Sequence, residues 1–161
     1  MQGKTSLGRQ ETSYSIAQAW ESISWKRFFF SAFAAMIVKA IIFILFDGFK
    51  GISSNGPAVC SALGLTCSPL MTGLIGFVFF IIVSVVFYGL MYVLFMHQFS
   101  GGTLFLKGLM LGLAMGFISI IIMPWLTYAY RDYISTALGY YAFTQVMVLL
   151  YRTKYELENN G

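Results

Sequence analysis

Charged side chains are scarce in this sequence. Asp, Glu, Lys and Arg make up 10% of the 161 residues, whereas a soluble domain carries about 25%. Hydrophobic residues make up 58% of the chain, and the mean hydropathy is +0.77. We therefore predict an all-α integral membrane protein. The net charge is +4, but the basic residues do not cluster into a patch, which argues against a nucleic-acid partner.

Groups that carry chemistry are also few. His97 is the only histidine, so two imidazoles from one chain are not available to hold a haem. No two carboxylates fall within any long apolar run, which leaves no acid–base pair there. Gly101 and Gly102 lack the Gly-Lys-Ser/Thr that completes a phosphate-binding loop. We predict no catalytic site, no metal and no cofactor, and therefore a protein that is not an enzyme.

The sequence has only two cysteines, Cys60 and Cys67, and both lie in the polar segment 47–69. Two cysteines without a nearby histidine do not make a four-ligand zinc site. If the segment faces an oxidising space, a disulfide between them is expected. Two free thiols are the alternative.

Long apolar runs dominate the rest of the chain. They predict four transmembrane helices, at about residues 28–46, 71–96, 104–125 and 134–151. The segment 47–69 is then an outer loop, and residues 1–161 form a single membrane domain. The fourth span is the most polar of the set.

The segment before the first span has its own periodicity. Ile16, Trp20 and Ile23 follow the i, i+4, i+7 spacing of one helical face. We predict an amphipathic helix at about 12–25 that lies on the membrane surface. A helix that packs on a partner protein is the alternative.

The basic residues outside the spans are unevenly distributed. With four spans, Lys50 and Arg131 fall on one side, and seven basic residues fall on the side of the termini: Lys4, Arg9, Lys26, Arg27, Lys107, Arg152 and Lys154. The positive-inside rule then places both termini in the cytoplasm. We expect a plasma membrane, of the bacterial inner-membrane kind, with the cysteine loop facing outward.

Glycines recur every four residues in the third span, at Gly108, Gly112 and Gly116. This spacing forms one stripe along a helix, and small-xxx-small stripes are typical of close helix packing in membranes. Ser31 and Ala35 form a similar stripe in the first span. We predict that the two stripes pack against each other with their helices parallel. Glycine is also generally common in membrane helices, which is the simpler interpretation.

Lys39 continues the Ser31–Ala35 stripe and lies about 12 Å of helix before Asp47. The depth of Tyr141 and Gln145 in the fourth span makes them the predicted partners of its ammonium. One alternative is that the lysine stem extends outward so that the charge reaches the membrane surface. The other is an ion path or an anionic-ligand site.

Two functions from different classes fit this sequence. The first is a non-catalytic accessory or assembly subunit of a larger membrane complex, and it is the one we favour. The alternative is a small oligomeric transporter or channel that uses Lys39 and the polar residues of the fourth span. The expected partners are membrane lipids and either other integral membrane subunits or further copies of the chain.

Overall fold

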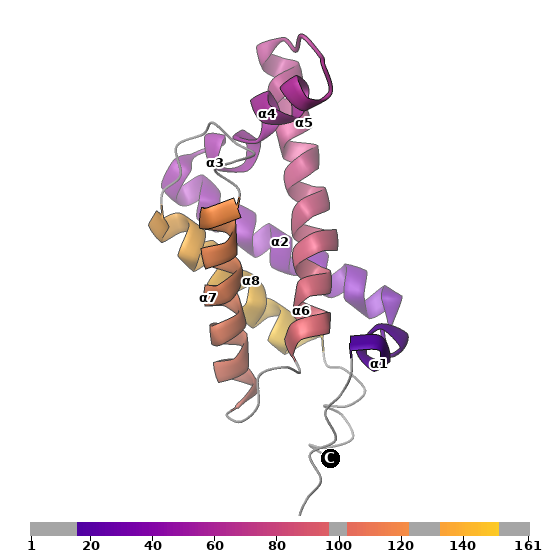
Figure 1. Ribbon diagram of the computed structural model, residues 1–161. Helices are drawn as coiled ribbons and strands as arrows, with labels where there is room; N and C mark the ends of the chain where they lie inside the picture. The colour runs from indigo at the N-terminus through magenta and orange to yellow at the C-terminus, as the bar shows by residue number, and fades with distance from the viewer. Residues whose placement is uncertain (1–15, 97–102, 123–132, 152–161) are drawn as a thin grey trace, which may run out of the picture.

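The computed structural model describes residues 16–96, 103–122 and 133–151 (Figure 1). Across these ranges the chain forms helices joined by turns, with no strand. Three helices are long and apolar enough to cross a membrane: Trp25–Asp47, Pro69–Phe95 and Tyr133–Leu150. The all-helical architecture and the apolar helices are consistent with membrane localisation.

The N-terminal helix α1 covers only Ile16–Glu21, and residues 12–15 lie outside the described ranges. It packs against the helix α6 described below. Ile23 is buried, whereas Ile16 and Trp20 are about half exposed, so the predicted apolar face is divided between two environments. The structure therefore does not confirm an amphipathic surface helix over 12–25.

Helix α2 (Trp25–Asp47) begins three residues before the predicted first span and ends one residue after it. Gly48 ends the helix with a positive φ of 62°, a conformation that glycine adopts without steric cost, and its N–H donates to the carbonyl of Ile44. Two short helices follow in the predicted loop, α3 (Lys50–Ser53) and α4 (Gly56–Ala62).

The loop packs closely against α5 because two glycines allow the backbones of the loop and of α5 to come into contact. A Cβ atom at Gly56 would collide with the backbone of Thr72, and one at Gly76 with the backbone of Ser53. Cys60 and Cys67 lie at disulfide distance, with their Cα atoms 6.2 Å apart. These contacts hold α3 and α4 against the start of the next helix.

The second span is one long helix in three parts: α5 (Pro69–Ile82), the π-helical segment η1 (Val83–Tyr88) and α6 (Gly89–Phe95). Pro69 occupies the first turn, where its missing N–H costs nothing, and the Ser68 hydroxyl caps the N–H of Met71 at 3.4 Å. Its 27 residues extend about 40 Å, more than the roughly 30 Å of a hydrocarbon core.

Helix α7 covers Leu104–Ile122, and residues 123–125 of the predicted third span lie outside the described ranges. Within it, Leu104–Ser119 qualifies only as a shorter apolar helix. The structure thus supports three membrane-length helices and does not confirm the predicted count of four. The last helix, α8, runs from Tyr133 to Leu150.

Helix α8 is the main packing partner of both α2 and α7 (Figure 1). A Cβ atom at Gly112 would lie 2.6 Å from Thr144 Oγ1 and 3.1 Å from Tyr141 Cα, both in α8. On another face of α8, the ring of Phe43 from α2 fills the space beside Gly139. The extensive contacts of α2 and α7 are thus with α8 and not with each other, which differs from the predicted parallel contact between the first and third spans.

Candidate functional site

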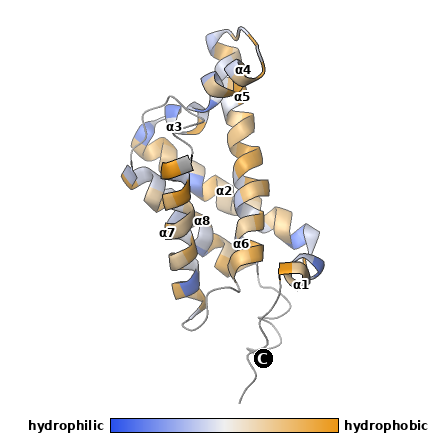
Figure 2. Cartoon of the chain, viewed as in Figure 1, coloured by the Kyte–Doolittle hydropathy of each residue, from blue (hydrophilic) through white to orange (hydrophobic). Residues whose placement is uncertain are grey.

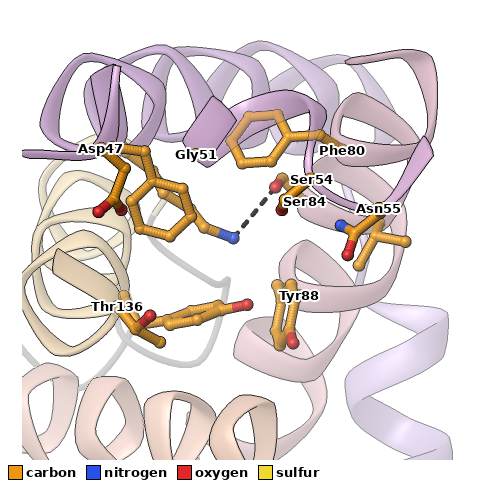
Figure 3. Close-up of a pocket in the computed structure, with 12 residues that line it drawn as sticks. Asp47, Gly51, Ser54, Asn55, Phe80, Ser84, Tyr88 and Thr136 are labelled. Carbon is orange, nitrogen blue, oxygen red and sulfur yellow. Dashed lines mark hydrogen bonds between the residues drawn. The ribbon is translucent and has the colours of Figure 1, made fainter. Parts of the chain in front are cut away.

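Lys39 lies inside the bundle, where only 2% of its surface is exposed. Its Nζ atom donates a hydrogen bond of 3.1 Å to Ser84 Oγ in the neighbouring long helix (Figure 3). Ser84 is equally buried. A charged group in such surroundings is costly unless polar or electrostatic partners replace water, so the partners around Nζ define the site.

The π-helical segment supplies two of these partners. It places Ser84 and Tyr88 on the side that faces α2, and both side chains are buried. Single π-helical turns inside α-helices occur frequently at functional sites. In the sequence, Ser84 stands between Val83 and Val85 in a continuous apolar run. The sequence alone does not mark Ser84 as a site residue, because a lone serine in such a run has no distinctive spacing.

Aromatic rings surround the ammonium group. The Nζ atom lies 4.0 Å from the ring centroid of Tyr140 and 4.7 Å from that of Tyr88. Three further centroids lie between 5.2 and 5.9 Å away, those of Phe80, Phe43 and Phe143. The face of an aromatic ring is electronegative and attracts a cation within about 6 Å. The rings and the serine together form a cage that fits a lysine ammonium.

Tyr140 connects this cage to the third helix of the bundle. Its hydroxyl shares a hydrogen bond of 2.9 Å with Ser119 Oγ in α7. Its backbone carbonyl accepts a hydrogen bond of 3.1 Å from the Thr144 hydroxyl, one turn further along α8. Lys39, Tyr140 and Ser119 therefore join α2, α8 and α7 through one aromatic side chain.

A cavity of about 40 Å³ adjoins the lysine (Figure 3). Its polar lining comes from four segments and comprises Lys39, Asp47, Ser54, Asn55, Ser84 and Thr136. One water needs roughly 10–15 Å³ of such volume and two to four polar partners, so the cavity is suited to a few water molecules. At one edge, Asp47 Oδ2 accepts a hydrogen bond of 2.7 Å from Ser135 Oγ, which ties α2 to the start of α8.

The structure places the two predicted partners of Lys39 elsewhere. The Tyr141 ring packs edge-on against Phe105 of α7, with centroids 6.4 Å apart. Gln145 Nε2 donates a 3.3 Å hydrogen bond to the Phe105 carbonyl. Tyr140 takes the position expected of Tyr141. The predicted depth along the fourth span was correct to within one residue. Successive residues of a helix point in directions about 100° apart, so depth alone does not determine which side chain faces Lys39.

The predicted packing residues fall into two groups. Gly108 and Gly112 lie against α8, where an added Cβ at Gly108 would approach Val148 to 2.7 Å. Gly116 has more space, with its nearest neighbour Ala137 Cα at 3.8 Å. Ser31 and Ala35 are fully buried in α2. The Ser31 hydroxyl has no hydrogen-bond partner within the described part of the chain.

No group of three potential metal ligands occurs among the described residues. Comparisons with models of protein families, with curated proteins and with solved structures found no match to this chain. The buried-lysine site is therefore interpreted from its own geometry.

Proposed function

We propose that this protein is a non-catalytic integral membrane protein that serves as an accessory or assembly subunit of a larger membrane complex. The observation that carries the proposal is the difference between the inside of the bundle, where polar side chains contact one another, and its apolar outside. Lys39 contacts Ser84 and Tyr140, and Tyr140 in turn contacts Ser119, so these buried side chains hold the helices together from within. The outward faces of the helices are apolar.

The apolar outer faces are extensive. On α7, the exposed side chains include Phe105, Met110, Leu113 and Phe117, and comparable rows occur on α2 and α5. In a membrane, such faces contact lipid tails or the helices of other subunits. Because lipid tails are as apolar as leucine, association there depends on shape and small residues. A bundle that is held together by buried contacts and presents apolar outer faces is suited to that role.

We further propose that α7 is part of a fourth span and that both termini lie in the cytoplasm of a cell with a bacterial type of inner membrane. The seven-to-two distribution of basic residues supports this orientation. The start of α2 and the end of α8 lie at the same end of the molecule, where the rings of Phe28 and Tyr151 are 6.4 Å apart. The segment 12–25 then remains a candidate surface helix at that end.

A pull-down in gentle detergent tests the accessory role. Tagged protein, expressed at its natural level and extracted from its source membrane, should retain another integral membrane protein in a fixed ratio. An unrelated tagged bundle of similar size and hydropathy serves as the control for nonspecific capture. Recovery of this chain alone, from intact and folded material, would contradict the proposal.

The cavity beside Lys39 supports a second candidate, a small oligomeric transporter or channel. Ionisable residues within membrane spans commonly mark ion or substrate paths, and this cavity has the volume for water. Flux of ions or solutes into liposomes that contain only this chain would favour transport, provided that Lys39→Met abolishes the flux and leaves the fold intact. Liposomes that contain the folded protein and show no flux of ions or solutes would exclude this candidate.

A further inference from the structure

Two adjoining hollows lie on the surface where α3 meets the start of α5. One has a volume of about 670 Å³ and the other about 350 Å³. Ser53, Pro69 and Gly73 line both of them, so the hollows adjoin at these residues, and together they are called the groove. The groove lies outside the lysine cage, although Asp47 borders both features.

The larger hollow is the more polar half of the groove. It contains Asp47 and Lys50, the two charged residues of the segment 47–69. Within the described part of the chain, no ion pair engages either of them. Asp47 Oδ2 accepts the hydrogen bond from Ser135 Oγ, so the hollow offers a ligand the Lys50 ammonium and the remaining acceptor capacity of the Asp47 carboxylate.

The smaller hollow is the apolar half. Apart from Ser53 and the glycine, its lining is hydrophobic: Phe49, Ile52, Pro69, Leu70, Leu74 and Phe77. Phe49 and Leu70 are 75% and 76% exposed. Figure 2 shows the hydrophobic colour along α5, next to the more hydrophilic α3 region. This half is suited to a hydrocarbon chain.

Gly73 lies at the junction of the two halves, next to open space. Glycine within a helix costs about 1 kcal/mol relative to alanine. At Gly56 and Gly76 the missing Cβ allows another backbone to approach, but a Cβ at Gly73 would meet nothing within 4 Å. Glycine is also used where a backbone must lie close to a ligand, and Gly73 fits that use.

We propose that this groove binds a zwitterionic phospholipid, with its phosphate at Lys50, its ammonium at Asp47 and one acyl chain across Gly73 along the apolar half. The opposite charges of Asp47 and Lys50 favour a headgroup with both signs over a purely anionic one. The adjacent hydrophobic wall accounts for the acyl chain. This inference requires membrane insertion, but it is independent of whether the protein is an accessory subunit or a transporter.

Native mass spectrometry of the full-length protein, titrated with phosphatidylethanolamine or phosphatidylglycerol, tests the headgroup assignment. The intact protein should bind phosphatidylethanolamine more tightly. Lys50→Gln should weaken that binding about tenfold, because it removes one charge-assisted contact. Lys26→Gln removes an exposed cation at the other end of α2 and should leave binding unchanged. Asp47→Asn should shift the preference towards phosphatidylglycerol.

The acyl-chain assignment is tested by filling the groove. Gly73→Leu should lower phosphatidylethanolamine binding without loss of thermal stability, because the new side chain enters open space. Val78→Leu adds volume at an exposed position of the same helix outside the groove and is the matched control. If Gly73→Leu fails to fold, Gly73→Ala provides a smaller obstruction. Equal binding of the two lipids, or unchanged binding by both Lys50→Gln and the Gly73 variant, would overturn the proposal.

Discussion

Lys39 shows how one side chain organises three helices. Its ammonium donates to Ser84, and the ring of Tyr140 lies 4.0 Å away. Removing one member of a buried polar contact leaves the other without its partner, which costs more than the contact itself is worth. The lysine therefore contributes to stability because Ser84 and the surrounding aromatic rings would lose their partner without it.

The first prediction concerns the charge of Lys39. Lys39→Met keeps much of the stem and removes the ammonium, so it should lower the free energy of unfolding in detergent by about 1–3 kcal/mol. Lys26→Met, at an exposed position, is the matched control. A double-mutant cycle with Ser84→Ala should give a coupling energy of about 0.5–3 kcal/mol. A neutral or stabilising effect of Lys39→Met would show that Ser84 and the rings do not depend on the charge.

The second prediction concerns Ser31. Its hydroxyl is buried without a hydrogen-bond partner in the described structure. Ser31→Ala removes this unsatisfied group and should raise the stability by up to about 1 kcal/mol, measured by thermal unfolding. Thr144→Ala makes a similar change at a hydroxyl that donates to the Tyr140 carbonyl, and it should be destabilising. A clear loss of stability in Ser31→Ala would mean that its hydroxyl does have a partner in the membrane.

For individual residues, the sequence predicted which side chains are unusual better than it predicted which side chains contact them. It identified Lys39 as the unusual group and Cys60 and Cys67 as a possible pair, because each is rare in its segment. It predicted Tyr141 instead of Tyr140, since a one-residue difference rotates the side chain to another face of the helix. Ser84 was not predicted because it lies in a local π-helical segment, which the sequence did not reveal and which affects the direction of its side chain.

At the scale of elements, the central contact is that between α7 and α8. The glycines of α7 allow the two backbones to approach closely, and α8 in turn meets α2 through Gly139. The ends of the long helices were predictable to within a few residues from the apolar runs. Which helices pack together was not, because several spans have small residues at similar depth and only the complete set of side chains selects the neighbours.

The third prediction tests this contact. Gly112→Leu places a side chain where a Cβ atom alone would lie 2.6 Å from Thr144 Oγ1, so it should separate α7 from α8. Leu113→Ile, at a half-exposed position, keeps the volume and should have little effect. The readout is the unfolding temperature in detergent. If both variants have the same unfolding temperature as the original protein, the glycine stripe faces lipid and the α7–α8 packing is incorrect.

At the scale of the whole molecule, the distribution of basic residues predicts the orientation. Both termini are expected in the cytoplasm, with residues 47–69 on the opposite side. The fourth prediction is that reporter fusions at Gly161 and within residues 51–57 report opposite sides of the membrane. Fusions after Lys107 and Lys154 should agree with the Gly161 fusion. The same side for Gly161 and residues 51–57 would eliminate the four-span arrangement.

We propose that this bundle is a subunit that acts through its apolar outer faces. The most direct measurement is the native mass of the particle that contains this chain after extraction from its source membrane. We expect a particle in which one or more copies of the 18.0 kDa chain are bound to a different integral membrane protein at fixed stoichiometry. A particle made of this chain alone, whether monomer or homo-oligomer, would contradict it.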